Sequence, residues 1–236
     1  MSLDRGEGDG GRGLSRRQFA AGIAWTTPAV LVVASAPALA ASGCFVLDWN
    51  QKANGTAAAG VAFTTQSAGG AAGPTITPTG TISPANANNT TYDMKVGYQG
   101  RELNTLATIS GMSTSNLGLI LNTAYGPSGS PTEAVTFTMS APVTSISFQL
   151  YGWNRLSNYF IETLAFSRSV TLTGTSLNAT TGTGTFNRTV DEATPTSVTV
   201  TATSATAFTT FSMTLTDTNF TGQDMRLGIG DLTVCS

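Results

Sequence analysis

The chain has 236 residues, of which 40% are hydrophobic and only 10% are charged, and its formal net charge is −2. This hydrophobic content is sufficient for a packed core, which excludes a chain that is disordered throughout, and the lack of basic excess excludes electrostatic binding to nucleic acid. The chain contains no histidine, which removes Ser-His-Asp and Cys-His catalysis and histidine-ligated zinc sites.

The first forty residues are predicted to be an export signal. Arg16 and Arg17 precede an apolar stretch that ends in an A-x-A pattern at Ala40, and a charged head, an apolar middle and such an end are the three parts of a signal peptide. Paired arginines are typical of substrates of the twin-arginine translocase. Cleavage after Ala40 leaves a single domain, 41–236, with 7 basic and 10 acidic residues and a net charge of −3. An uncleaved membrane anchor is the alternative, although no second apolar segment follows.

From residue 44 onward the sequence alternates between apolar and polar residues with a period of two, which is typical of β-strands. Strands are predicted at 44–49, 61–65, 75–82, 92–98, 117–122, 135–139, 146–150, 169–174, 183–190, 198–200, 211–215 and 225–235. Pro142 predicts a turn between the runs "VTFTM" and "SISFQL", so these two runs are expected to form a hairpin. Short strands separated by Gly, Pro, Asn and Ser indicate an all-β, antiparallel β-sandwich of jelly-roll-like type.

The two cysteines, Cys44 and Cys235, lie in the first and last predicted strands. If these strands pair antiparallel with the cysteines opposed, Phe45 faces Val234 and Leu47 faces Leu232, and one face of the pair is apolar throughout. One register therefore separates core from surface and aligns the cysteines, which predicts a disulfide formed after export. Lipidation of Cys44, which follows "LAASG", is the alternative.

The same register places Asp48 opposite Asp231, and like charges that are directly opposed destabilise a sheet. One hypothesis is a calcium ion that bridges the two carboxylates together with loop carbonyls. The alternative is that the aspartates point into water or accept backbone hydrogen bonds at the strand ends. A bulge near Gly228 or Gly230 is also expected, because Leu227 and Ile229 otherwise fall on the wrong face.

The segment "LYGWNRLSNYF" is the candidate for ligand binding. Leu150 continues a core face, so the aromatic rings that follow it are expected on the other side, next to amide and guanidinium donors that suit a sugar or a protein partner. The candidate residues are Tyr151, Trp153, Asn154, Arg155 and Tyr159. In the alternative, the segment folds back and buries these rings.

Threonine-rich runs such as "VTVTATS" suit the solvated, uncharged face of a sheet. O-glycosylation after export and an ice-ordering threonine array are the alternatives for these runs. Their irregular spacing along the chain disfavours a regular array.

No catalytic constellation is evident. Without histidine and with both cysteines bonded, only carboxylate pairs of the glycosidase kind remain as catalytic candidates. The acids Glu102, Glu133, Glu162, Asp191 and Glu192 are expected in unrelated turns. The sequence therefore predicts a protein that is not an enzyme and has no cofactor, apart from the calcium hypothesis.

The segments "FVLDWN", "VTFTMSAPVTSISFQLYGWN" and "LGIGDLTVC" resemble a family of secreted β-sandwich domains found in actinobacterial and other bacterial cell-surface proteins. The resemblance implies a surface location and adhesion, and it implies no enzymatic activity. Where the family pattern has D-I-D after its central strand, this chain has Gly152 and Asn154 in place of the acids.

These observations predict a secreted, non-catalytic β-sandwich of the cell surface that serves adhesion or envelope interaction. Its expected partners are cell-envelope or extracellular polysaccharide or protein, besides the translocase during export. A carbohydrate-binding module that uses exposed aromatics is the alternative, followed by a glycoside hydrolase-type enzyme.

Overall fold

The computed structural model describes residues 43–83, 92–102, 105–123, 132–156, 160–191, 197–217 and 226–236. Residues 41–236 form one compact unit. The predicted signal, with Arg16, Arg17 and Ala40, lies outside the described residues, so the export route stays a prediction. Among the described residues, no helix is both long and apolar enough to cross a membrane.

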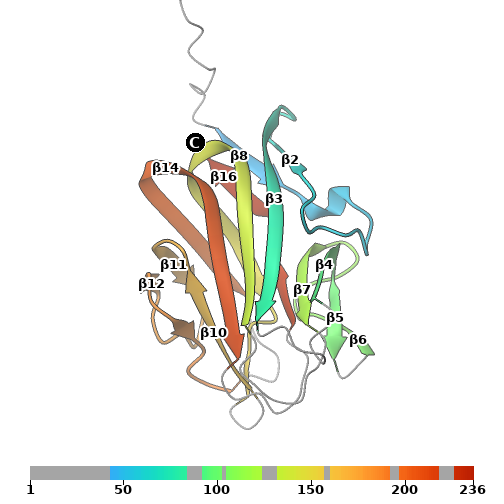
Figure 1. Cartoon of the computed structure of the whole chain (residues 1–236), viewed down its shortest axis with the longest axis vertical. Helices are drawn as coiled ribbons and strands as arrows, with labels where there is room; N and C mark the ends of the chain where they lie inside the picture. Colours follow the sequence, from blue (N-terminus) through green and yellow to red (C-terminus); the bar gives the residue numbers. More distant parts are fainter. Residues whose placement is uncertain are drawn as a thin grey trace, which may run out of the picture. The chain divides into compact units, whose positions relative to one another are not determined.

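The described residues are almost entirely β-strand, with one single-turn 3-10 helix, η1 (Figure 1). In chain order the elements are β1 (Cys44–Leu47), η1 (Trp49–Gln51), β2 (Phe63–Gln66), β3 (Ala72–Ser83), β4 (Tyr92–Gly97), β5 (Gln99–Glu102), β6 (Thr105–Thr108), β7 (Gly118–Thr123), β8 (Thr132–Tyr151), β9 (Arg155–Leu156), β10 (Phe160–Phe166), β11 (Val170–Thr173), β12 (Thr181–Gly182), β13 (Phe186–Asn187), β14 (Val198–Asp217), β15 (Arg226–Ile229) and β16 (Leu232–Cys235). The prediction of an all-β, antiparallel sandwich with paired first and last strands is confirmed.

The centre of the fold is a ribbon of two long strands, β8 and β14, which pair antiparallel along their whole length. Both strands bend over at the upper end of the view in Figure 1. Their pairing register shifts on either side of Phe208, which faces Val143. The inward face changes at the same place, since buried residues are odd-numbered from Glu133 to Met139 and even-numbered from Ile146 onward. The bend therefore places the two halves of the ribbon in different layers.

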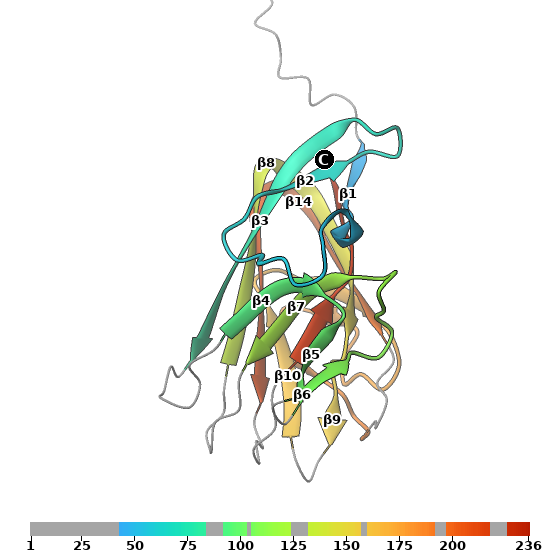
Figure 2. The same ribbon diagram turned by 90° about the vertical axis from the view of Figure 1, so that its right-hand side faces the viewer.

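Each half of the ribbon has its own neighbouring strands. In the first layer, the first half of β8 pairs with β3, and the second half of β14 pairs with β10. In the second layer, the second half of β8 pairs with β16 and β15, and the first half of β14 pairs with β11. β7 and β4 extend the second layer beyond β15, and in Figure 2 these two strands face the viewer.

Aromatic side chains from both halves of the ribbon meet in the core. The ring of Phe148, in the second half of β8, lies 6.1 Å from that of Phe137 in the first half and 5.9 Å from that of Phe211 in β14. All three side chains are buried. A cross-layer aromatic contact of this kind is what two inner faces make when they pack as a sandwich.

The predicted hairpin between residues 135–139 and 146–150 is wrong. Both runs belong to the single strand β8, and both pair with β14 rather than with each other. Pro142 lies at the bend, where the ladder is irregular, and a residue without an N–H is tolerated there. A turn residue between two alternating runs does not distinguish a hairpin from a strand that folds over.

The remaining predicted strands are largely confirmed, with three exceptions. The strand predicted at 44–49 ends at Leu47, and Trp49 begins η1. The run 183–190 contains only the two-residue strand β13. The run 225–235 is split into β15 and β16. From Ile229 to Thr233 the chain advances four residues while its partner advances three, from Leu150 to Ser147. One extra residue at Gly230–Asp231 is the expected bulge, and it restores the inward direction of Leu232.

Candidate functional site

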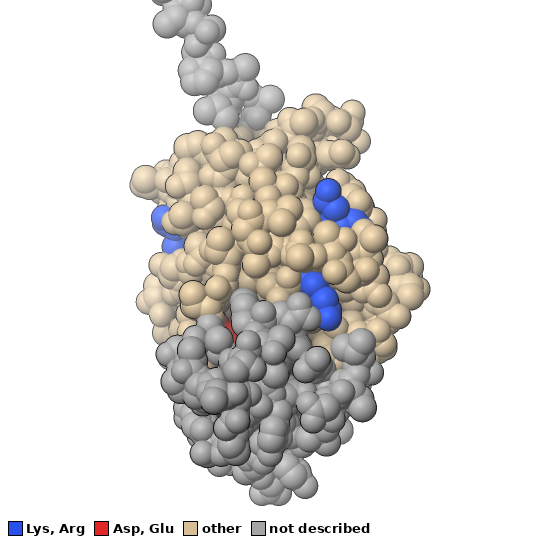
Figure 3. Space-filling model, turned by 45° about the vertical axis from the view of Figure 1, so that its right-hand side comes forward, with Lys and Arg blue, Asp and Glu red and all other residues tan. Residues whose placement is uncertain are grey.

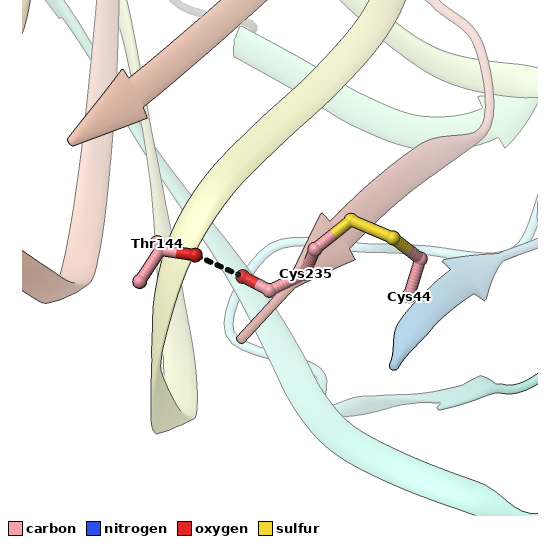
Figure 4. The surroundings of a disulfide bond; sticks show 3 residues. All are labelled: Cys44, Thr144 and Cys235. Atoms are coloured by element: carbon pink, nitrogen blue, oxygen red, sulfur yellow. Dashed lines mark hydrogen bonds between the residues drawn. A yellow bond between two sulfur atoms is a disulfide. The ribbon is translucent and has the colours of Figure 1, made fainter. Parts of the chain in front are cut away.

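The first and last strands are joined as predicted. Cys44 and Cys235 form a disulfide, and the pairing of β1 with β16 has the expected register from Cys44–Cys235 to Leu47–Leu232. Thr144, at the bend of β8, donates a hydrogen bond from Oγ1 to the carbonyl oxygen of Cys235 at 3.2 Å (Figure 4). Because the sulfur of Cys44 is bonded to that of Cys235, it is not available for a lipid.

This disulfide lies in a ring of strands at the bent end of the ribbon. The pairing order runs from β8 through β16, β1, β2 and β3 back to β8. The ring is closed because β8 contributes one half to each side of it. The covalent bond thus joins two neighbouring members of a ring that hydrogen bonds already close.

The two aspartates at the end of β1 accept backbone hydrogen bonds. Asp48 caps η1 by accepting from the backbone N–H of Asn50 at 2.8 Å, and Asp231 accepts from the backbone N–H of Trp49 at 3.0 Å. Partial burial raises the pKa of Asp231, the hydrogen bond from Trp49 lowers it, and the charge of Asp48 raises it further. These contacts match the backbone-bonding alternative, and calcium binding by the pair stays a prediction.

The candidate ligand-binding segment corrects one expectation. Trp153 is 0% exposed, and its Nε1 donates to the carbonyl oxygen of Glu162 at 3.1 Å. The Arg188 guanidinium lies 5.3 Å from the centroid of its ring. The exposed position considered for Trp153 is therefore wrong, and the alternative is confirmed for this ring, because the chain turns back after β8 and packs the indole into the core. Tyr151 is half-buried against a small cluster that includes Ile109.

The other candidates in this segment make contacts within the chain. The backbone N–H of Asn154 donates to Glu162 Oε2 at 2.7 Å. Arg155 forms an ion pair with Asp191 at 3.2 Å and donates from Nη1 to the carbonyl oxygen of Arg188. Asn154 and Arg155 are both partly buried. Tyr159 lies outside the described residues.

The turn that starts this segment has a backbone that favours glycine. Gly152 has a φ of 78°, which is strained for any residue with a Cβ. A Cβ at this position would lie 2.9 Å from Cγ2 of Ile109. This geometry accounts for a glycine at position 152.

Three acidic side chains are buried together at the end of the ribbon opposite the bend. Glu133, Glu162 and Asp217 are 1%, 4% and 1% exposed, respectively. Glu162 and Asp217 are directly opposed in the pairing of β10 with β14. Glu133 is opposed to Leu215, two residues before Asp217. The three inward-facing carboxyl groups are therefore neighbours on one inner face.

The surroundings of Glu162 favour its protonated form. Burial raises its pKa well above the usual range, the hydrogen bond from Asn154 lowers it, and the charges of Asp217 and Glu133 raise it. The charge of Arg226, in β15, opposes this shift. Burying acids is costly, so this cluster is notable in a chain with so few charged residues.

The expectation that the acids lie in unrelated turns is wrong for Glu133, Glu162 and Glu102, since Glu102 ends strand β5. Asp217 was not among the acids identified from the sequence. A signal was present, because Val135, Phe137 and Met139 already define the inward face of β8, and the same alternation extended by two residues reaches Glu133. In the same way Leu215 leads to Asp217. An acid in phase with a core face is the pattern that indicates burial of Glu133 and Asp217, whereas their grouping depends on strand pairing.

The outward face of the first layer carries ranks of hydroxyl groups. We call this surface the hydroxyl face. It lies on β3, on the first half of β8, on the second half of β14 and on β10. It consists of Thr77, Thr79, Thr81, Thr132, Thr136, Thr138, Thr163, Thr210, Ser212, Thr214 and Thr216. The pairing register places these side chains opposite one another across up to three strands. One rank is Thr77, Thr138 and Thr210, and the next is Thr79, Thr136 and Ser212.

These hydroxyl groups also contact one another. Thr136 and Ser212 lie 2.8 Å apart at their side-chain oxygens, and Thr132 and Thr216 lie 3.3 Å apart. Thr163 donates from Oγ1 to the carbonyl oxygen of Thr216. The irregular spacing noted in the sequence concerns other threonine-rich runs, whereas the ranks on this face form between strands that are distant in the sequence.

The described surface is poor in charge. In Figure 3, which shows the molecule from a direction between those of Figures 1 and 2, most described residues are neither acidic nor basic, and the basic side chains lie apart from one another. This view shows one side only. On that side the surface presents no electrostatic patch for an anionic partner.

No family model matches the chain, and neither a curated protein nor a solved structure does.

Proposed function

We propose that the protein is a secreted, non-catalytic β-sandwich of the bacterial cell surface that contacts neutral polysaccharide of the envelope or extracellular matrix. The observation that carries the proposal is the hydroxyl face, with its aligned and mutually bonded threonines. The disulfide supports a location outside the cytoplasm, because such bonds persist in oxidising compartments.

The chemistry of the hydroxyl face suits an uncharged, repeating partner. Each threonine hydroxyl both donates and accepts, as sugar hydroxyls do, and strands about 4.8 Å apart present such groups at regular intervals. A neutral hydrogen bond contributes only about 0.5–1.5 kcal/mol net. Useful affinity on this face therefore requires many simultaneous contacts, which a polysaccharide provides and a small sugar does not.

Two other functions are less well supported. A module that stacks sugars on Tyr151 and Trp153 needs an exposed indole, and that of Trp153 is buried. A hydrolase would use Glu162 and Asp217, but carboxyl groups that are 4% and 1% exposed do not meet a substrate in this conformation. Both observations favour a contact surface over a stacking cleft or a catalytic site.

Co-sedimentation of the mature protein with insoluble polysaccharides and purified cell walls tests the proposal. Thr136→Glu places a charge in the middle of the hydroxyl face and is expected to abolish binding. The matched control is Thr201→Glu, on the outward face of the other layer, where Thr201 is opposed to Ser147 and Thr171. Equal binding by the two variants, or no wild-type binding to any polysaccharide, would show that the hydroxyl face is not a contact surface.

The export part of the proposal has its own test. Replacing Arg16 and Arg17 with lysine is expected to keep the protein inside a host that exports the wild type through the twin-arginine route. The mature wild-type protein is expected to begin at Ala41, which N-terminal sequencing measures. Export that is unaffected by the lysine pair would contradict the proposed route.

A further inference from the structure

The buried acids hold a short stretch of chain by its backbone. Glu162 Oε2 accepts from the backbone N–H of Asn154 at 2.7 Å, directly before β9. Asp217 Oδ1 accepts from the backbone N–H of Ile161 at 3.1 Å, and Ile161 is opposed to Arg155 in the pairing of β10 with β9. Glu162 thus holds the residue that precedes β9, and Asp217, in β14, holds the start of β10 opposite β9.

Glu162 also holds the indole of Trp153, whose Nε1 donates to the carbonyl oxygen of Glu162 at 3.1 Å. The backbone and side chain of Glu162 therefore hold two consecutive residues, Trp153 and Asn154. A change in the charge of Glu162 acts directly on the attachment of β9.

We propose that Glu162, with Asp217 directly opposed to it, acts as a pH-responsive clamp, in which β9 is held firmly against β10 at acidic pH and detaches more readily as the pH rises. The charges that face Glu162 come from each neighbouring element: Asp217 of β14, Glu133 of β8 and Arg226 of β15. Two of these three groups are acids, so an ionised Glu162 is repelled by more carboxylates than it has cationic partners in this set. The charged groups on and near β9 are Arg155 of β9 itself, which is paired with Asp191, and Arg188, which lies over the ring of Trp153.

The direction of the pH dependence follows from the environment of Glu162 when β9 is attached and when it is detached. Burial raises the pKa of Glu162 in the attached state, whereas a solvated glutamate titrates near its ordinary pKa of about 4.3. The attached state therefore binds the proton more tightly. Its extra stability is complete below the ordinary pKa and is lost as the pH rises through the raised pKa. Between the two pKa values, the equilibrium constant for detachment increases up to about tenfold per pH unit.

Amide hydrogen exchange at Asn154 and Ile161 measures this equilibrium. The experiment uses the mature, disulfide-bonded protein from pH 5 to pH 8, with rates corrected for intrinsic exchange. We expect protection at both amides to fall as the pH rises. Glu162→Gln retains a hydrogen-bond acceptor without a charge and is expected to remove this pH dependence.

Asp191→Asn is the matched control, because it removes the ion pair with Arg155 without changing the buried acids. It is expected to lower protection near β9 by the same factor at every pH. Protection that does not vary with pH in the wild type, or an unchanged pH dependence in Glu162→Gln, would overturn the proposal.

A direct titration decides the question if Glu162→Gln does not fold. In wild-type protein with ¹³C-labelled glutamate, the carboxyl carbon of Glu162 is expected to titrate well above the ordinary range. The indole N–H signal of Trp153 is expected to shift over the same pH interval. Titration of Glu162 at the ordinary pKa of a glutamate would overturn the proposal.

Discussion

Replacing both cysteines with serine tests the role of the disulfide in the fold. Cys44 and Cys235 are separated by 191 residues, so the bond closes nearly the whole domain into one loop. In the chain-entropy model, closing a loop of this length restricts the unfolded state by about 5 kcal/mol at 25 °C. The contacts around the bond remain in the variant, because four opposed pairs join β1 to β16 and Trp49 Nε1 donates to the carbonyl oxygen of Gly230 at 2.9 Å.

The loss of stability is therefore expected to come from the greater conformational freedom of the unfolded chain, with the native structure unchanged. For a domain of this size each kcal/mol shifts the thermal midpoint by about 2–4 °C, so a decrease of about 10–20 °C is expected. Urea denaturation followed by tryptophan fluorescence measures the free energy of unfolding. The slope against urea is expected to increase, because an unlinked chain exposes more surface.

A reducing agent provides the control, since it should destabilise the wild type and leave the double-serine variant unchanged. A loss below about 1 kcal/mol, with an unchanged urea slope, would refute the reasoning. It would mean that the unfolded chain already keeps its ends together, so that the bond removes no freedom.

Three further substitutions test particular contacts. Trp153→Ala removes a fully buried indole and is expected to cost about 3–5 kcal/mol of unfolding free energy in urea denaturation; a loss below 1 kcal/mol would indicate a surface ring. Asp231→Asn is expected to raise the thermal midpoint at pH 7 but not at pH 3, because the raised pKa of Asp231 means that its ionised form destabilises the fold. Calcium chloride tests the metal hypothesis on the same pair, since bound calcium would raise the midpoint of the wild type and not that of the variant. Gly118→Ala places a Cβ 2.5 Å from the carbonyl oxygen of Ile229 and is expected to cost about 1–3 kcal/mol in the same urea assay; an unchanged midpoint would show that the backbone yields.

The pairing of the chain ends could be predicted from the sequence because it depends on local information. Alternation assigns a face to each residue of β1 and β16, and a slip of one residue would turn every core side chain outward. The cysteines then select one register among those that keep the alternation. Two short segments were sufficient, and the rest of the fold was not needed.

The bend, the acid cluster and the hydroxyl face could not be predicted in this way, because each depends on pairing between distant strands. Whether Pro142 marks a hairpin or a fold in one strand is decided by β14, which follows some fifty residues later. The neighbourhood of Glu162 and Asp217 requires the register of β10 with β14. The ranks that contain Thr136 require three strands in register at once.

The two ends of the ribbon of β8 and β14 are stabilised in different ways. At the bent end the strand ring is closed covalently by Cys44 and Cys235. At the other end, where the arrowhead of β14 lies in Figure 1, the chain is held by groups whose charge depends on pH. Because the two sites lie at opposite ends of the ribbon of β8 and β14, their effects on stability should add to within about 0.5 kcal/mol.

A variant that combines Glu162→Gln with the double-serine change tests this independence. At pH 8 its free energy of unfolding is expected to equal the wild-type value corrected by the sum of the separate effects. A deviation above 1 kcal/mol would show that the bend of β8 transmits strain from one end of the ribbon to the other. In that case the disulfide would itself influence how firmly β9 is held.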